Sequence, residues 1–523
     1  MSDEPKAMIS TMQKDEAELA KMGYKQELKR ELGLIQNFGV SFSVISVITG
    51  IPSLFLYGLN TGGPAVMVYG WIVVSFFTMT VGLAMAEVCS SHPVSGGPYF
   101  WAAMLSNPEN APLASWVTGW FNLLGQVAVT TGISFACATF ISTVITFKTA
   151  FVPTANTQIG WFLIVDYSFG VRVLHILNNI SVWWHAIGTF SLVVAILAKA
   201  PTHQSGHFVF QTFIDGTGGW AERASPAYVA ITGILMAQVI CTLIDSVICM
   251  TEETNNAAMS GSIGIVMAIG VSAILGIYLL LGLLFSIQDL QTTIDSPNGP
   301  VGQIFLDCVG ERGAIVLMVI VIGAMFFCGT FSVTSNSRMM YAFARDGALP
   351  GSKFFAYVST QWRSPIRTVW LACTLSFILG LPSLGSSVAF SAATSIATIG
   401  LYISYAIPIA LRVVYRKNFV RGPFHLGKFS FPIAATAVAW IAFISIVFML
   451  PQENPVDSQT LNYAIVAVGI VLLYSFTYWL VSARKWFVGP VKQISGTFLF
   501  KLPRLLASYW VAILKRKRWV SMA

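Results

Sequence analysis

An apolar segment near the start of the chain is interrupted by Phe42-Ser43-Val44-Ile45-Ser46-Val47-Ile48-Thr49-Gly50-Ile51-Pro52-Ser53. Gly50 loosens a helix, and Pro52 removes one backbone donor while disfavouring helical geometry at Ile51. The segment is long enough to cross a membrane. We therefore predict a spanning helix that is broken near its middle. A simple proline kink, which membrane helices tolerate, is the alternative.

The surrounding sequence has the composition of a polytopic membrane protein. Of the 523 residues, 55% are hydrophobic and only 10% are charged, whereas a soluble domain carries about 25% charged residues. A soluble enzyme, a disordered chain and a nucleic-acid-binding domain are therefore excluded, despite the net charge of +8. The 7 cysteines are scattered without metal-ligand spacing, so no disulfide framework, metal site or cofactor is predicted. Residues 1–30 lack an apolar core, so no cleavable signal peptide is expected.

Twelve segments are apolar enough to cross the hydrocarbon core, which takes about 20 helical residues. The predicted fold is therefore an all-α polytopic membrane protein with twelve transmembrane helices. Asp166 and Tyr167 make the fourth span the weakest. The predicted spans are 35–59, 64–87, 115–145, 157–174, 180–199, 226–250, 263–288, 314–336, 366–384, 387–411, 431–450 and 461–481.

The basic residues predict the orientation of these spans. Alternating the loops places 26 of the 30 lysines and arginines on one side of the membrane. The other side receives only Lys148, Lys199, Arg223 and Arg312. Because cytoplasmic loops carry the excess of Lys and Arg, both termini are predicted to be cytoplasmic. The expected location is the plasma membrane, with the vacuolar membrane as the alternative.

Span six carries a second interruption, Cys241-Thr242-Leu243-Ile244-Asp245-Ser246-Val247, with Asp245 at mid-membrane depth. The separation of Gly50 and Cys241 is close to that between the starts of spans one and six. Two interrupted spans at matching places indicate an inverted-repeat transporter with its site at the midplane. The predicted organisation is a cytoplasmic tail (1–34), a first repeat (35–199), a second repeat (226–411), two further helices (431–481) and a basic cytoplasmic tail (482–523).

Four motifs carry a family resemblance. They are Ala86-Glu87-Val88-Cys89-Ser90-Ser91-His92-Pro93-Val94-Ser95-Gly96-Gly97-Pro98-Tyr99, Ser115 to Asn122, Asp245 to Thr254, and Thr334 to Gly347. The first resembles the signature of the amino acid/polyamine/organocation permeases, and the others resemble the fungal amino acid/choline (GABA-permease-like) branch. The resemblance runs from about Gly23 to Arg484. It implies substrate transport and a five-plus-five inverted-repeat (LeuT-like) fold with two extra C-terminal helices.

The break in span one is a candidate substrate site. Ser46, Val47, Ile48, Thr49 and Gly50 are expected to expose backbone N–H groups at the positive end of the following half-helix. That environment suits a carboxylate, and Gly50 lets a ligand approach the backbone closely. A kink without a ligand is the alternative.

Asp245 and its neighbours Thr242 and Ser246 are the second part of the predicted substrate site. A charged carboxylate inside the bilayer costs at least about 2.5 kcal/mol, so it needs a partner or an aqueous cavity. An ammonium group of the substrate is such a partner. The carboxyl group could instead carry the coupling proton, or cap the second half-helix. Members of the family often carry His four residues later, where this chain has Cys249, which weakens the choice of substrate that the family implies.

His185 in span five is the second candidate for proton coupling, because His titrates near neutral pH. The resemblance implies a position near spans one and eight, where related sodium symporters hold a cation. A hydrogen bond between helices is the alternative. Asn122 and Gln126 lie on one face of span three and are candidates for lining the substrate path. Polar contacts between helices are the commoner reason for such a stripe.

Charged residues at the cytoplasmic ends of three spans are candidate gate residues. They are Glu87 after span two, Glu252 after span six and Arg338 after span eight. Opposite charges at an inner mouth suggest a gate that pairs when it is closed. Static surface pairs worth under about 1 kcal/mol are the alternative.

The predicted function is a secondary active permease that imports an amino acid or a GABA-like amino compound with protons by alternating access. Its partners are the small amino substrate, the coupling proton and the lipid bilayer, without nucleic acid. No phosphate-binding GxxxxGK[ST] motif is present, so ATP is not the expected energy source. A choline or other quaternary-amine or polyamine permease is the alternative, with a non-transporting nutrient sensor or an intramembrane enzyme using His185 and Asp245 as further rivals. The chain is not predicted to be an enzyme, because no nucleophile motif accompanies those residues.

Overall fold

A computed structural model of the chain describes residues 4–149, 174–242, 246–359, 364–384, 387–416, 419–457 and 460–490, with isolated positions between 151 and 164. Within these residues the secondary structure is helical, apart from two isolated backbone bridges. This confirms the predicted all-α fold class. The long helices are α1 (Glu4–Lys21), α2 (Leu34–Ile45), α3 (Val47–Asn60), α4 (Gly63–Ser91), α6 (Ala111–Thr146), α8 (Leu174–Lys199), α14 (Ala257–Phe285), α16 (Pro300–Arg345), α18 (Ile366–Gly380), α19 (Ser387–Val414), α20 (Ser430–Val447) and α21 (Ala464–Val481).

Shorter helices connect or interrupt the long ones. They are α5 (Gly97–Leu105), α9 (Gly206–Gln211), α10 (Trp220–Arg223), α11 (Pro226–Gly233), α12 (Leu235–Cys241), α13 (Ser246–Cys249), α15 (Leu290–Asp295) and α17 (Ser352–Phe355). Four 3-10 turns, η1 (Thr251–Glu253), η2 (Leu381–Leu384), η4 (Gly427–Phe429) and η5 (Ala483–Lys485), complete the described helices.

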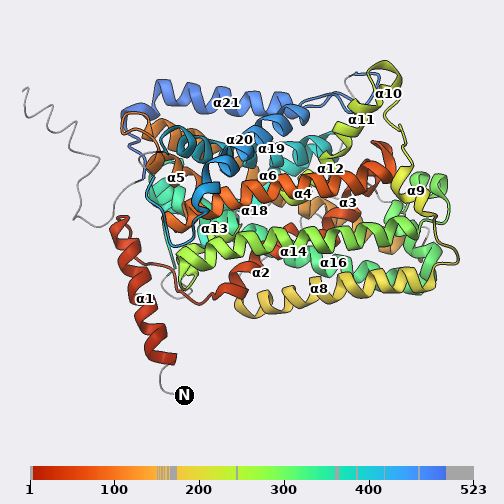
Figure 1. Ribbon diagram of the computed structural model, residues 1–523, viewed down its shortest axis with the longest axis horizontal. Helices are drawn as coiled ribbons and strands as arrows, with labels where there is room; N and C mark the ends of the chain where they lie inside the picture. Colours follow the sequence, from red (N-terminus) through yellow and green to blue (C-terminus); the bar gives the residue numbers. More distant parts are fainter. Residues whose placement is uncertain are drawn as a thin grey trace, which may run out of the picture.

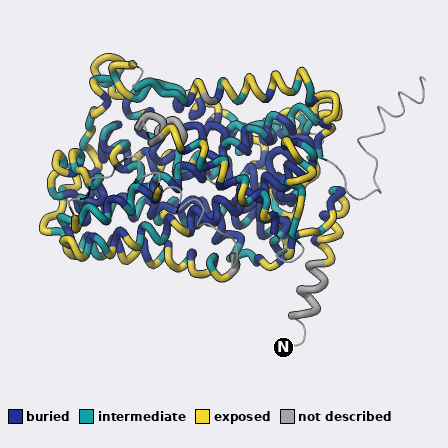
Figure 2. Tube along the Cα trace, turned by 180° about the vertical axis from the view of Figure 1, so that it is seen from behind, coloured by how far each residue is buried: buried dark blue, intermediate teal, exposed yellow. Residues whose placement is uncertain are grey.

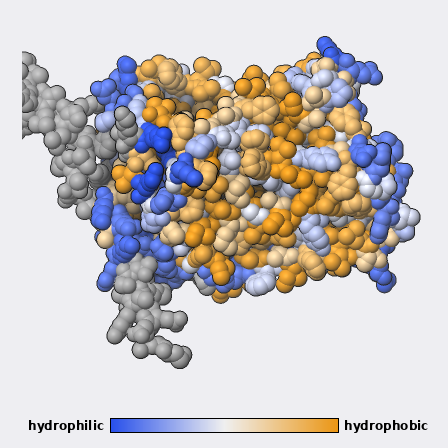
Figure 3. All heavy atoms as spheres, in the orientation of Figure 1, coloured by the Kyte–Doolittle hydropathy of each residue, from blue (hydrophilic) through white to orange (hydrophobic). Residues whose placement is uncertain are grey.

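Apart from α1, which projects from one end of the bundle, the long helices lie side by side along the long axis of the molecule, with α21 at one edge and α8 at the other (Figure 1). Hydrophilic side chains gather at the two ends of the bundle, and hydrophobic side chains cover most of the face between them (Figure 3). The centre of the bundle is buried, while exposed residues lie on the outer helices and at the ends (Figure 2). This is the distribution expected for a bundle that is surrounded by lipid.

Ten helices within the described residues are long and apolar enough to cross a membrane. They coincide with ten of the twelve predicted spans. The predicted ninth span corresponds to α18, a shorter apolar helix, Ile366–Gly380. The predicted fourth span, 157–174, lies almost entirely outside the described residues, together with Asp166. An integral membrane protein is thus confirmed, and the count of twelve stays a prediction.

Span one is broken, but four residues before the position predicted from Gly50. Helix α2 ends at Ile45 and α3 begins at Val47, and Ser46 between them has φ 37° and ψ 72°, the left-handed region. Gly50 and Pro52 both lie inside α3. The amide of Gly50 already donates to the Ser46 carbonyl at 2.9 Å, so the helix has restarted before either residue. The prediction of a broken span is confirmed, and the predicted position is corrected.

Span six is built from three short pieces in place of one helix. Helices α11 and α12 meet at Ile234, and α12 ends at Cys241 before α13 begins at Ser246. Leu243, Ile244 and Asp245 lie outside the described residues. The described pieces pack against α3, α4, α16 and α19. Both interrupted spans therefore lie in the interior of the bundle, as a midplane site requires.

Candidate functional site

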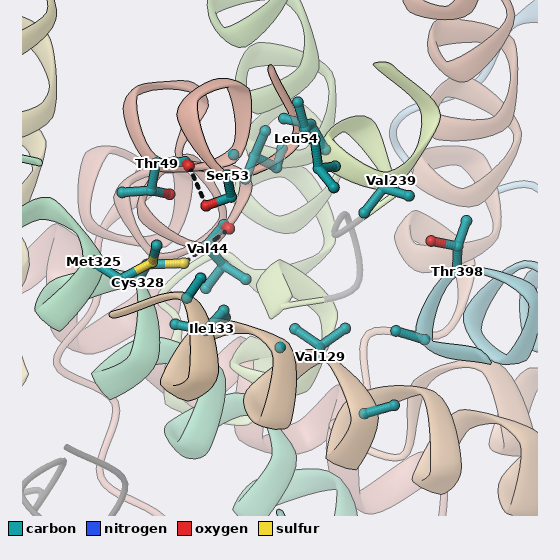
Figure 4. Close-up of a pocket in the computed structure, with 17 residues that line it drawn as sticks. Val44, Thr49, Ser53, Leu54, Val129, Ile133, Val239, Met325, Cys328 and Thr398 are labelled. Carbon is teal, nitrogen blue, oxygen red and sulfur yellow. Dashed lines mark hydrogen bonds between the residues drawn. The ribbon is translucent and has the colours of Figure 1, made fainter. Parts of the chain in front are cut away.

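A cavity of about 90 Å³ lies beside the break in span one and is lined by residues of α2, α3, α6, α12, α16 and α19 (Figure 4). About 10–15 Å³ is enough for one water molecule, so this volume holds several waters or a small ligand. Thr49 and Gly50 contribute to the lining and Ser46 does not; substrate binding by these residues stays a prediction. Val47 and Ile48 are buried but are not lining residues.

The cavity wall is mostly aliphatic, with a few weak polar groups. Thr49, Ser53 and Thr398 bring hydroxyl groups to the lining. The Ser53 hydroxyl donates to the Thr49 carbonyl at 2.8 Å, and the Cys328 thiol donates to the Val44 carbonyl at 3.3 Å (Figure 4). The described lining residues include neither a charged nor an aromatic side chain. Such a wall suits an uncharged aliphatic group.

Helix ends supply the strongly polar groups near the cavity. Helix ends leave carbonyl groups, and helix starts leave N–H groups, without intrahelical partners. At this break the amides of Thr49 and Gly50 already donate to the Ser46 carbonyl, and the Cys328 thiol donates to the Val44 carbonyl. The two sets face the break at Ser46, next to lining residues Ile45 and Thr49. N–H groups at a helix start bind anions, and carbonyls at a helix end bind cations.

His185 on α8 is hydrogen-bonded to the break itself. Its Nδ1 donates to the Ser181 carbonyl at 2.8 Å, so in the neutral ring Nε2 is the acceptor. The Ser46 hydroxyl then donates to Nε2 at 2.9 Å, and the Thr49 hydroxyl lies 2.7 Å from the Ser46 hydroxyl oxygen. Thr49 lines the cavity. A continuous chain of hydrogen bonds therefore joins the buried imidazole to the cavity.

Asn122 and Gln126 face other helices and are not among the residues that line the cavity. The Asn122 amide donates to the Ser404 hydroxyl at 3.2 Å, and Gln126 donates to the Ser335 hydroxyl at 3.5 Å. These bonds join α6 to α19 and α16. The two residues therefore make the polar contacts between helices that were the alternative interpretation. Their role in substrate binding stays a prediction.

Thr242 and Ser246 flank the break in span six, and both are buried. The Thr242 hydroxyl donates to the Gln238 carbonyl at 2.6 Å. Neither residue is among those that line the cavity. Asp245, the predicted partner of an ammonium group or a proton, lies outside the described residues, so its role stays a prediction.

One end of the bundle carries a cluster that we call the charged mouth: Glu252, Glu253, Arg338 and Arg345. Arg345 pairs with Glu252 at 3.2 Å, and both side chains are almost fully buried. Arg338 pairs with Glu253 at 2.8 Å. The Glu252 carboxylate also accepts from the backbone N–H of Ser95 at 3.1 Å. The predicted gate residues Glu252 and Arg338 thus lie in two neighbouring ion pairs.

Glu87, the third predicted gate residue, belongs to a different cluster. Its carboxylate pairs with Arg412 of α19 at 2.6 Å and accepts from the Ser430 hydroxyl. These contacts tie α4 to α19 and α20. Glu87 therefore lies outside the charged mouth, and its role as a gate residue stays a prediction.

The N-terminal segment (residues 15–32) covers the charged mouth, although residues 1–34 were predicted to be a tail. The guanidinium of Arg30 donates to the Thr254 carbonyl at 2.6 Å and to the Thr251 carbonyl at 3.2 Å. The Gln26 amide donates to the Glu252 carbonyl at 2.8 Å. These bonds run across the turn η1, which follows span six. The segment therefore holds the end of span six in place.

Tyr24 is the centre of this contact. Its hydroxyl donates to the Asp346 carboxylate at 3.0 Å, and the hydroxyl of Tyr99 donates to the same oxygen at 2.9 Å. Burial, together with the Asp346 carboxylate, raises the pKa of Tyr24 well above its usual range, so the hydroxyl remains a donor. The Arg345 guanidinium lies 4.0 Å from the centre of the Tyr24 ring. Neither Tyr24 nor Asp346 was predicted, because isolated aromatic and acidic residues in a charge-rich segment give no periodic signal.

Comparison with known proteins gives consistent matches over nearly the whole chain. The family model described as "Amino acid permease" matches residues 32–473. The chain is 44% identical to the amino-acid permease BAT1 homolog of Oryza sativa subsp. japonica, covering 92% of this chain and 96% of that protein. It is 42% identical to amino-acid permease BAT1 of Arabidopsis thaliana, covering 93% and 98%. An uncharacterized amino-acid permease of Schizosaccharomyces pombe is 32% identical, covering 91% and 89%.

Proposed function

The chain belongs to the amino acid permease family, and from this premise we propose that it imports a small amino acid together with protons by alternating access. Its relatives are named as transporters and not as enzymes, which agrees with the predicted absence of catalysis. The proposal has three further parts: the substrate, the coupling ion, and the side of the membrane that the charged mouth faces.

The observation that carries the proposal is the cavity at the break between α2 and α3. Helix ends on one side offer acceptors and donors for an ammonium and a carboxylate group. Val129 and Ile133 of α6 and Val239 of α12 on the other side offer an aliphatic surface. A neutral amino acid presents this combination of groups. We therefore propose that the amino and carboxylate groups bind at the break and that the side chain points toward α6 and α12.

The composition of the wall also bears on the alternatives. Recognition of a quaternary ammonium group such as choline uses a cage of aromatic rings, and the described lining residues contain none. A polyamine would require several acidic partners, which the described lining also lacks. A GABA-like compound, with its amino and carboxylate groups further apart, fits the same helix ends. We therefore propose both amino acids and GABA-like compounds as substrates.

We propose His185 as the proton-coupling group because of its hydrogen bonds to Ser46 and, through it, to Thr49. When Nε2 gains a proton it becomes a donor, so the Ser46 hydroxyl must turn away and donate elsewhere. The nearest hydroxyl is that of Thr49, 2.7 Å away. A proton on His185 would thereby change the hydrogen-bonding character of the cavity wall. Asp245 is retained as the second candidate for this role on the basis of the sequence.

The positive-inside pattern supports the proposal that the charged mouth faces the cytoplasm. In that orientation the ion pairs of Glu252 and Arg345 and of Glu253 and Arg338 close the inner side of the cavity. The N-terminal segment strengthens this closure through Arg30 and Tyr24. Release of substrate into the cytoplasm then requires these contacts to break.

Counterflow in proteoliposomes tests the substrate assignment without any driving ion. Vesicles that contain the purified protein are loaded with one unlabelled amino acid, and entry of the labelled compound is measured. We expect exchange of small neutral amino acids or GABA, and no exchange of choline or spermidine. Exchange of choline alone would contradict the proposed substrate, and absence of exchange for every compound would support a non-transporting sensor.

A further inference from the structure

A cluster of buried polar side chains lies between α4, α12, α19 and α20, inside the bundle. Its centre is Gln238 of α12, whose side chain is fully buried. The Gln238 amide nitrogen donates to the Tyr402 hydroxyl at 2.5 Å and to the Thr242 hydroxyl at 3.1 Å. The Gln238 amide oxygen accepts from the indole N–H of Trp440 at 3.1 Å. Both donor positions of the amide and one acceptor position are therefore used.

The partners of Gln238 are held in turn by neighbouring helices. The Tyr402 hydroxyl lies 3.3 Å from the hydroxyl of Thr78 on α4. The Tyr405 hydroxyl donates to the Thr242 carbonyl at 3.4 Å. The Trp440 ring stacks on Phe77 of α4 with the ring centres 4.3 Å apart. The C-terminal end of α12 is thus tied to α19 by two separate bonds, next to the break in span six.

The same two helices form one side of the cavity. Val239 and Ile240, which follow Gln238 directly on α12, are lining residues. Thr398, one turn before Tyr402 on α19, lines the cavity as well. The bond between Gln238 and Tyr402 therefore fixes the separation of α12 and α19 immediately behind the cavity wall.

We propose that Gln238 is a positioning residue that sets the width of the cavity between α12 and α19, and thereby the size of the substrate side chain that the protein accepts. The inference rests on the proposed function, since it takes the cavity as the amino acid site. A buried amide is stable only when its donors and acceptors are satisfied. The cluster consequently has one favourable arrangement, which defines one wall position.

Removal of the amide should widen the cavity. In Gln238→Leu the Tyr402, Thr242 and Trp440 groups lose their common partner. One of the two bonds that tie α12 to α19 is then lost, and the bond from Tyr405 to the Thr242 carbonyl remains. A small substrate then loses contact with the wall, whereas a large one gains room. We expect the KM of the smallest transported aliphatic amino acid to rise by roughly tenfold, the effect of one or two lost contacts. The KM of the largest transported one should change less, so that the ratio of the two KM values shifts.

The experiment measures initial uptake of both amino acids in proteoliposomes for the wild type, Gln238→Leu, Tyr402→Phe and the double variant. The two single variants should shift the KM ratio in the same direction. The double variant should shift the KM ratio no further than Gln238→Leu does alone, because both changes remove the same bond. Tyr402→Phe keeps the ring in place, and so provides a second test if Gln238→Leu folds poorly.

Two tryptophan variants provide a matched comparison. Trp440→Phe deletes the donor to Gln238. Trp71→Phe deletes the indole donor of another buried tryptophan, which bonds to the Ala273 carbonyl at 3.0 Å between α4 and α14. Only Trp440→Phe should shift the KM ratio, although both changes are expected to lower the thermal stability of the purified protein.

The outcomes separate the inference from the function on which it rests. Wild-type protein that transports amino acids, together with an unchanged KM ratio in both Gln238→Leu and Tyr402→Phe, would overturn the positioning role alone. An equal shift of the KM ratio in Trp71→Phe would also overturn the positioning role, because the shift would then follow from a general loss of packing. Wild-type protein without amino acid uptake would overturn the proposed function, and this inference with it.

Discussion

Gly50 lies where α3 packs against α12, at the edge of the cavity. A Cβ atom at this position would lie 2.8 Å from Ile240 Cγ1 and 3.0 Å from Ile240 Cγ2. Gly50→Val should therefore push Ile240 into the cavity. Overpacking of this kind costs about 1–3 kcal/mol, so we predict that the KM for the amino acid rises by roughly tenfold or more. Concentration-dependent uptake measures the change, with surface expression followed in parallel.

Gly270→Ala is the control for this variant. A Cβ atom at Gly270 on α14 would lie 3.7 Å from Met79 Cε, which is an ordinary contact. Uptake should therefore be unaffected. Normal KM in Gly50→Val would remove α3 from the substrate site.

His185→Gln separates proton coupling from structure. A glutamine amide can donate to the Ser181 carbonyl and accept from the Ser46 hydroxyl, so the local bonds of His185 persist. It cannot take up a proton near neutral pH. We predict that counterflow survives in His185→Gln while accumulation driven by a pH gradient is lost. Accumulation at the wild-type level would show that His185 only holds helices together.

Individual residues were predicted where their chemistry alone singles them out. His185 was predicted because it titrates near neutral pH, and Thr49 and Gly50 because they lie in a broken span. Gln238 was not predicted, since a lone amide in an apolar run gives no periodic signal. Its partners Tyr402 and Trp440 lie 164 and 202 residues further along the chain. Only the packing of distant helices brings such residues together.

The secondary-structure elements were predicted more completely than their breaks. The apolar lengths located ten spans, because each needs about 20 residues of low polarity. The break in span one was expected near Gly50 and Pro52, yet the chain turns at Ser46. Pro52 is the sixth residue of α3 and lies inside the helix, as membrane helices tolerate. Serine in a left-handed conformation has no comparable sequence signal.

The N-terminal segment makes contacts that the sequence analysis did not predict. Residues 1–34 were predicted only as a cytoplasmic tail. A few side chains, including Leu19, Tyr24 and Leu28, are nevertheless buried against the bundle. The buried positions change from a spacing of four (Asp15, Leu19) to a spacing of two (Leu28, Arg30, Leu32), so no single period runs through the segment. A segment that docks through irregular contacts is invisible to pattern analysis.

Tyr24→Phe tests whether this segment holds the charged mouth closed. The change deletes one hydrogen bond to the Asp346 carboxylate, a bond to a charged group worth about 1.5–3 kcal/mol. We predict that the mouth opens roughly tenfold more often. A variant that retains Cys328 as its only cysteine reports this opening, since Cys328 lines the cavity. A thiol reagent applied to the charged-mouth side should label it faster in Tyr24→Phe.

Lys21→Gln is the matched control, because Lys21 is an exposed residue at the end of α1. Labelling of Cys328 should not change in this variant. Equal rates in Tyr24→Phe and the parent would mean that the N-terminal segment rests on the mouth without closing it.

At the scale of the whole molecule, the proposal joins three features: a cavity at the break in span one, an imidazole bonded to that break, and a mouth closed by buried ion pairs. Composition alone predicted the membrane-spanning class, and the signature after span two predicted the family. The individual ion pairs of the mouth could not be predicted, because they depend on which charged side chains face each other in three dimensions. Glu87 shows this, since it pairs with Arg412 and not with the mouth.

The most direct test is net accumulation of a labelled neutral amino acid in proteoliposomes that contain only this protein, without ATP or sodium. With the interior alkaline relative to the exterior, the internal concentration should rise above the external one and should fall back when a proton ionophore is added. Accumulation that follows a sodium gradient and ignores the pH gradient would contradict proton coupling. Equilibration without accumulation under either gradient would contradict secondary active transport.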